Sequence, residues 1–130
     1  MDSPIFCVEL VRGAGPNFPY GDSARRFQIF LPLRGDRCVD TDALRYGRAA
    51  FTGTRLRASD GKAYGKIVFA APQQFVLAYE DAKFYPSTLQ FYQTPIIVGG
   101  AIRICEYEER PLAYEVISVK RAAVAHDARR

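Results

Sequence analysis

The chain has 130 residues, of which 48% are hydrophobic and 25% are charged, and its formal net charge at pH 7 is +4. This length suits one domain, and the composition excludes a disordered, a collagen-like and a disulfide-dense chain. Because the three cysteines are odd in number and lack CxxC spacing, we expect reduced thiols, with neither a disulfide framework nor a zinc knuckle.

The first third of the sequence predicts two strands and a short helix. Short apolar and alternating runs over residues 4–12 and 26–33 predict strands, separated by a loop that runs to residue 23. Residues 41–47 predict one helical turn, with Thr41 as its N-cap and Gly47 as its stop.

A hairpin is the clearest local feature of the sequence. Its extended runs, residues 51–58 and 63–70, flank Asp60 and Gly61. Asp-Gly is a preferred pair for a two-residue type I′ turn. A two-residue turn fixes the register of the strands, and the register decides which side chains share a face.

With that turn, the hairpin has one basic face and one core face. On the basic face, Arg57 lies opposite Tyr64 and Arg55 lies opposite Lys66. We expect this face to be exposed to solvent. The residues expected to face the core are Thr52, Thr54, Ile67 and Phe69.

The second half of the sequence predicts further strands. Residues 74–79 predict one strand, whereas the sequence leaves the state of the aromatic segment 84–92 open. Residues 95–107 predict one long strand interrupted by a glycine pair. A turn then leads to a last strand over residues 113–121.

Together these elements predict one all-β domain over residues 1–121. We expect a small barrel or sandwich of about six to eight mostly antiparallel strands with minor helical turns, an OB-like barrel being one option. Residues 122–130 predict a frayed or disordered basic tail. Because the sequence shows neither a signal peptide nor a membrane span, we expect a cytoplasmic protein or one inside an intracellular or viral assembly.

Enzymatic chemistry has little support in the sequence. The only histidine, His126, lies in the predicted tail, where no fold would hold it for catalysis. Carboxylates and tyrosines can transfer protons without histidine. The candidates are Glu9, Glu106, Glu115, Tyr107 and Tyr114. Because all of them alternate with apolar neighbours in predicted strands, we expect them to point to solvent. We therefore predict no catalytic residue, no metal site and no cofactor, and favour a protein that is not an enzyme.

Positive charge is concentrated over residues 45–66, which contain six cationic side chains and a single acid, Asp60. Like charges at Arg55 and Lys66 would repel each other across the hairpin unless an anion lay near them. Cations beside an aromatic ring are typical of surfaces that bind single-stranded nucleic acid. The predicted polyanion-binding residues are Arg45, Arg48, Arg55, Arg57, Tyr64 and Lys66.

The leading functional prediction is a non-enzymatic binding or assembly module, most concretely a binder of single-stranded nucleic acid. The alternative is an oligomeric structural component of a virus-like particle or other multi-subunit complex. In that case the basic face meets an acidic protein surface of a neighbour, formed by Glu106, Glu108 and Glu109. A second alternative is a small-molecule-binding or isomerase-like β-barrel with an apolar cavity. The plainest interpretation of the basic hairpin is a solvated edge that resists aggregation.

Overall fold

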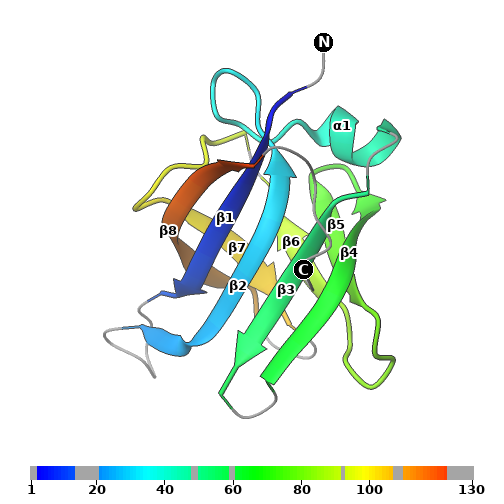
Figure 1. Cartoon of the computed structure of the whole chain (residues 1–130), viewed down its shortest axis with the longest axis vertical. Helices are drawn as coiled ribbons and strands as arrows, with labels where there is room; N and C mark the ends of the chain where they lie inside the picture. Colours follow the sequence, from blue (N-terminus) through cyan, green and yellow to red (C-terminus); the bar gives the residue numbers. More distant parts are fainter. Residues whose placement is uncertain are drawn as a thin grey trace.

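Eight antiparallel strands close into a barrel in the computed structural model of the chain (Figure 1). The structure describes residues 3–13, 21–47, 50–58, 61–91, 93–106 and 110–122. The elements are β1 (Ile5–Arg12), β2 (Asp22–Pro32), α1 (Thr41–Tyr46), β3 (Thr52–Arg57), β4 (Gly61–Ala71), β5 (Gln74–Tyr79), β6 (Ser87–Gln90), β7 (Ala101–Cys105) and β8 (Leu112–Ala122). The prediction of an all-β, mostly antiparallel fold of six to eight strands is confirmed, and of the two predicted options, barrel and sandwich, the structure has the barrel.

The barrel is of the up-and-down type. Each described strand is hydrogen-bonded to its neighbours in sequence, and β8 pairs with β1 to close the sheet. An OB-like barrel is a partly open Greek key, so the strand order excludes that option. The closed strand order leaves none of the eight described strands as an edge.

Side chains along the strands alternate between the interior and the surface. In β1, Phe6, Val8 and Leu10 are buried, while the residues between them are partly exposed. This alternation has the period of two expected for a strand with one face in a core. Inside the barrel, the rings of Phe27 and Tyr114 pack edge to face with their centroids 5.0 Å apart.

The helix α1 connects β2 to β3 along the chain and packs at one end of the barrel against β2 and β4 (Figure 1). Its buried Leu44 belongs to the core. The predicted helical turn is confirmed, but its N-cap is Asp40 and not Thr41. The Asp40 carboxylate accepts a hydrogen bond from the Ala43 amide at 3.0 Å. Within the described ranges, no helix has the length and apolar character needed to cross a membrane.

In the second half of the chain, the structure settles the segment that the sequence left open and corrects one predicted strand. The aromatic segment contributes β6, a strand of only four residues. The long strand predicted over residues 95–107 is wrong in its first part, because only Ala101–Cys105 form β7. Gly99 has a left-handed φ of +89°, which ends any extended run there.

The register between β3 and β4 also differs from the prediction. Arg57 pairs with Gly61 rather than with Tyr64, which is three residues further along. Gly61 has a φ of +73° and is already the first paired residue of β4, so it belongs to the strand and not to the turn. A displacement by an odd number of residues exchanges the two faces of a strand. The two arginines of β3 therefore point into the barrel.

The predicted core-facing pairs Thr52–Phe69 and Thr54–Ile67 are wrong for the same reason, although Ile67 lies in the core and Phe69 packs against it, as predicted. Thr52 pairs with Lys66 and Thr54 with Tyr64, and all four of these residues belong to the outer face. On the inner face of the hairpin, each strand also contributes a glycine. Gly53 lies opposite Gly65, which leaves room inside the barrel for neighbouring apolar side chains.

Candidate functional site

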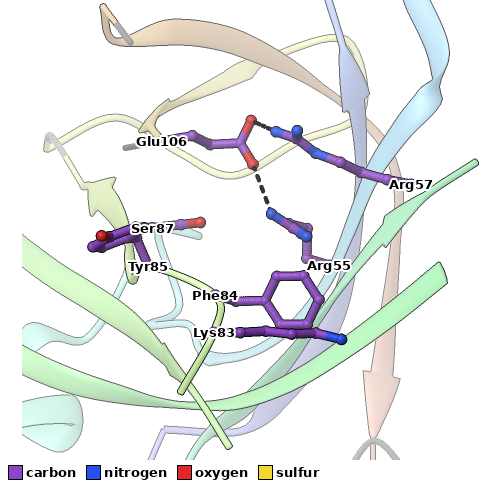
Figure 2. A pocket seen from close by; sticks show the side chains of 7 residues that line it. All are labelled: Arg55, Arg57, Lys83, Phe84, Tyr85, Ser87 and Glu106. Atoms are coloured by element: carbon purple, nitrogen blue, oxygen red, sulfur yellow. Dashed lines mark hydrogen bonds and ion pairs between the residues drawn. The ribbon is translucent and has the colours of Figure 1, made fainter. Parts of the chain in front are cut away.

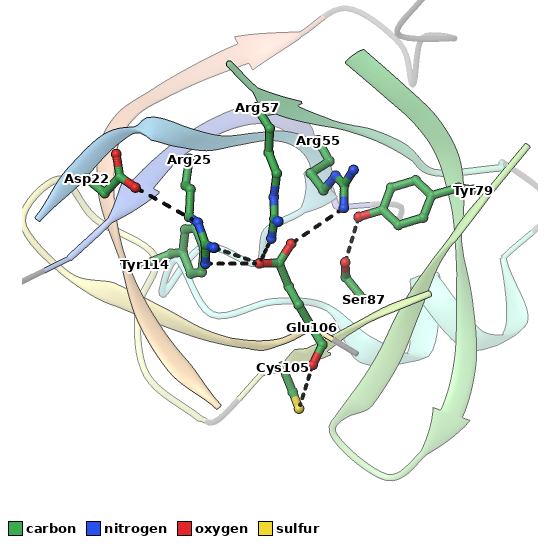
Figure 3. Close-up of polar contacts among 9 residues, drawn as sticks. All are labelled: Asp22, Arg25, Arg55, Arg57, Tyr79, Ser87, Cys105, Glu106 and Tyr114. Carbon is green, nitrogen blue, oxygen red and sulfur yellow. Dashed lines mark hydrogen bonds and ion pairs between the residues drawn. The ribbon is translucent and has the colours of Figure 1, made fainter. Parts of the chain in front are cut away.

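A cluster of charged and phenolic side chains lies inside the barrel, at the end opposite α1 (Figure 3). We call this end the mouth of the barrel. Arg25 comes from β2, Arg55 and Arg57 from β3, and Tyr114 from β8, while Glu106 directly follows β7. These five residues are the mouth cluster. Although far apart in sequence, they converge because the closed sheet brings β2, β3, β7 and β8 around one interior.

Glu106 is the centre of the mouth cluster. Its side chain is only 7% exposed, and its carboxylate forms a hydrogen-bonded ion pair with Arg57. The same carboxylate lies 3.9 Å from guanidinium nitrogens of Arg25 and Arg55. It also accepts a hydrogen bond of 3.2 Å from the Tyr114 hydroxyl. One buried carboxylate thus contacts three guanidinium groups in a place where water screens charge weakly.

Two phenols at the mouth are held in their protonated form. Burial raises the pKa of Tyr114, and the negative charge of Glu106 raises it further. Burial raises the pKa of Tyr79 to about 12, although the hydrogen bond of 2.6 Å between its hydroxyl and Ser87 acts in the opposite direction. Near neutral pH both groups therefore remain neutral hydroxyls that can donate hydrogen bonds.

A cavity of about 160 Å³ adjoins the mouth cluster (Figure 2). Its lining residues are Arg55, Arg57, Lys83, Phe84, Tyr85, Ser87 and Glu106. Figure 2 shows the guanidinium groups of Arg55 and Arg57 turned toward the Glu106 carboxylate, with the Phe84 ring beside Arg55. The cavity therefore has charged groups on one wall and aromatic rings on another.

The loop between β5 and β6 builds the aromatic wall. Asp81 organises this loop, since its carboxylate accepts a hydrogen bond from the Lys83 amide at 3.0 Å and its carbonyl accepts one from the Phe84 amide at 3.1 Å. The loop carries the Phe84 ring to 4.7 Å from the Arg55 guanidinium carbon, which also lies 5.5 Å from the Tyr79 ring. These two cation–π contacts hold Arg55 in place.

The structure separates the predicted polyanion-binding residues. Arg55 lies inside the barrel with Glu106, whereas Lys66 is exposed on the outer face together with Tyr64. The prediction that these residues share one exposed face with Arg57 is therefore wrong, and so is the expected repulsion between Arg55 and Lys66. Binding of nucleic acid itself stays a prediction.

Two predicted binding residues remain, Arg45 and Arg48. Arg45 is on α1, at the other end of the barrel, where its guanidinium carbon lies 3.9 Å from the centroid of the Phe69 ring. Arg48 lies outside the residues that the structure describes. Of the predicted residues that the structure describes, Arg55 and Arg57 are the two brought together at the mouth.

Two of the side chains expected to point to solvent instead point inward. Glu115 is exposed and Glu9 lies on the outer face of β1, but Glu106 and Tyr114 are buried. Glu106 is therefore not available to an acidic surface that meets a neighbouring subunit, and Tyr107, Glu108 and Glu109 lie outside the described residues.

A signal for the position of Glu106 was present in the sequence. Ile102, Ile104 and Glu106 follow one another with a period of two. If the two isoleucines face the core, then Glu106 faces it as well. The predicted acidic surface grouped Glu106 with Glu108 and Glu109, and this grouping overlooked the period of two.

The described residues contain no group of three or more His, Cys, Asp or Glu side chains close enough to hold a metal ion. Comparisons of the chain with protein-family models, with curated proteins and with solved structures find no significant match. The mouth cluster and its cavity are therefore the basis for the functional proposal.

Proposed function

We propose that this protein is a small-molecule-binding barrel whose ligand occupies the cavity at the mouth. The observation that supports this most is the cavity of about 160 Å³ between the mouth cluster and the loop that carries Phe84. Eight-stranded barrels have an interior just wide enough to be filled by side chains or to hold one small ligand. Apolar side chains fill most of this interior, and the cavity lies next to the polar groups at the mouth.

The chemistry of the walls also favours a ligand site. Ligand pockets combine aromatic side chains with a few convergent polar groups. Here Arg55, Arg57 and Ser87 supply hydrogen-bond donors, and Phe84 supplies a ring. Because its cation–π contacts already hold Arg55, little side-chain entropy is lost when a ligand binds to it.

Stability alone is a poor explanation for the mouth cluster. Replacing a buried group of ion pairs by well-packed apolar residues is often neutral or stabilising. A barrel that needed only to be closed at this end would be as stable with apolar side chains. Three buried or partly buried arginines around Glu106 are better explained by a polar ligand.

The proposal can be tested by mapping where one-ring compounds bind. Titration of the ¹⁵N-labelled protein with benzoate, benzamide, benzyl alcohol and benzylamine is followed in proton–nitrogen correlation spectra. We expect the largest shift changes at the backbone amides of Arg55 and Arg57 and of the loop residues Lys83, Phe84, Tyr85 and Ser87. Shift changes that instead cluster on the outer surface, or no change at these amides with any of the compounds, would contradict the proposal.

A pair of variants sharpens this test. Phe84→Ala removes the ring from the cavity wall and should weaken binding of every one-ring compound about tenfold, the value of an aromatic contact of about 1.4 kcal/mol. Tyr46→Ala removes an exposed ring from α1 at the opposite end of the barrel and should leave binding unchanged. Equal affinities of the two variants would argue against the cavity as the binding site.

A further inference from the structure

The charge of the cavity wall points to the chemical class of the ligand. We infer that the cavity binds a monocarboxylate of about one ring in size, with its carboxylate against Arg55 and Arg57. This inference rests on the proposed small-molecule function and goes further by naming the ligand class.

The first step is the balance of charge around the cavity. Among the described residues, the lining contains three cationic side chains and one carboxylate. Lys83 is largely exposed, and its ammonium group lies 3.6 Å from the Asp81 carboxylate. The deeper wall then consists of the guanidinium groups of Arg55 and Arg57 and the carboxylate of Glu106. A ligand carboxylate on this wall is a further acceptor for the N–H donors of the two guanidinium groups.

The second step is burial. The side chains of Arg55 and Glu106 are 9% and 7% exposed, and that of Arg57 is 18% exposed. Opposite charges attract each other more strongly in such a place than in water, because the surrounding protein screens them weakly. An anionic ligand therefore gains more from this wall than a neutral ligand of the same shape.

The third step is the geometry of the donors. A guanidinium group presents a planar fork of N–H donors that matches the two oxygens of a carboxylate. The Glu106 carboxylate uses one of its oxygens, Oε2, to accept a hydrogen bond from Arg57. Its other oxygen lies 3.9 Å from Arg55, which is beyond hydrogen-bond distance. A ligand carboxylate on the cavity side meets the same two arginines.

The fourth step is size. A cavity of roughly 150 Å³ is known to hold one benzene molecule. The cavity at the mouth, about 160 Å³, therefore accommodates one ring with a small substituent. With the carboxylate at Arg55 and Arg57, the ring lies toward Phe84 and Tyr85, the aromatic residues of the lining.

The inference is tested first with the unmodified protein. Dissociation constants are measured for benzoate, benzamide, benzylamine and phenyl phosphate. Binding at the mouth is verified by the amide shifts of Lys83, Phe84, Tyr85 and Ser87. Benzoate should bind at least about tenfold more tightly than benzamide, because charge-assisted hydrogen bonds are roughly twice as strong as neutral ones. Benzylamine should bind most weakly.

The outcomes separate this inference from the proposed function. If benzamide, benzylamine or phenyl phosphate binds at the mouth as tightly as benzoate, the small-molecule site stands and the assignment to monocarboxylates is overturned. If none of the four compounds shifts the mouth amides, the proposed function fails, and the inference fails with it.

A variant pair tests the role of Arg55 in the same assay. Arg55→Gln should lower the affinity for benzoate about tenfold or more and change that for benzamide by less than about threefold. Arg103→Gln is the matched control, since Arg103 is exposed on the outer face of β7. Unchanged benzoate affinity in Arg55→Gln would overturn the inference. Should that variant not fold, the comparison of benzoate with benzamide in the unmodified protein decides the question.

Discussion

Replacing Glu106 by Gln tests the energetics of the mouth cluster. The substitution removes one negative charge and nearly preserves the size of the side chain. The amide oxygen can still accept the hydrogen bond from Tyr114, so the loss concerns mainly the charge that faces Arg25, Arg55 and Arg57. Removing one partner of a buried ion pair costs about 3–5 kcal/mol. We expect this decrease in the free energy of unfolding, out of a total of roughly 5–15 kcal/mol for a typical domain.

Urea denaturation of the two proteins measures the difference. The matched control is Glu9→Gln, the same change in an outer-face pair. Glu9 lies 3.9 Å from Arg26, and the two side chains are 36% and 44% exposed. An exposed pair of this kind contributes about 0–1 kcal/mol. If Glu106→Gln destabilises the protein by less than about 1 kcal/mol, no more than the control does, the description of Glu106 as a buried charge among arginines is refuted.

Three further predictions concern the rest of the fold. Unfolding lets Tyr79 and Tyr114 ionise with their ordinary pKa of 10.0, so above pH 10 the unfolded state loses protons that the folded state keeps. The free energy of unfolding should therefore fall above pH 10 by up to about 1.4 kcal/mol per pH unit for each tyrosine. Urea titrations between about pH 9 and pH 11 measure this fall, and a flat profile would count against the buried phenols. Asp40→Ala removes the N-cap of α1 and should lower the midpoint of urea unfolding by the equivalent of about 1 kcal/mol. Thr41→Ala should have a smaller effect, and the reverse order would mean that Thr41 is the cap. A Cβ at Gly65 would lie 2.6 Å from the Ala78 carbonyl oxygen. Gly65→Ala should therefore destabilise the barrel by about 1–3 kcal/mol in thermal unfolding, and a neutral result would show that β4 and β5 are further apart.

The barrel itself was largely predictable because period-two alternation and turn residues are local signals. The alternation of Phe6, Val8 and Leu10 is visible in the sequence, and the structure buries all three. The short helix was predictable from its polar N-terminus and from Gly47, although the choice between Asp40 and Thr41 as N-cap depends on geometry that the sequence does not contain.

The candidate site was not predictable in the same way. The face of the β3–β4 hairpin depends on whether Gly61 is the last turn residue or the first strand residue, and this difference decides whether Arg55 lies inside or outside the barrel. The cavity also needs the loop that carries Phe84 to lie over β3, which is a contact between segments distant in sequence. Closure of the sheet creates that contact, and no local pattern predicts it.

A crystal structure of the complex with benzoate tests the central claim most directly. We expect the ligand inside the mouth of the barrel, with a carboxylate oxygen about 3 Å from a guanidinium nitrogen of Arg55 or Arg57 and the ring beside Phe84. Benzoate bound only on the outer surface, or Arg55 and Arg57 pointing away from the interior, would contradict the account.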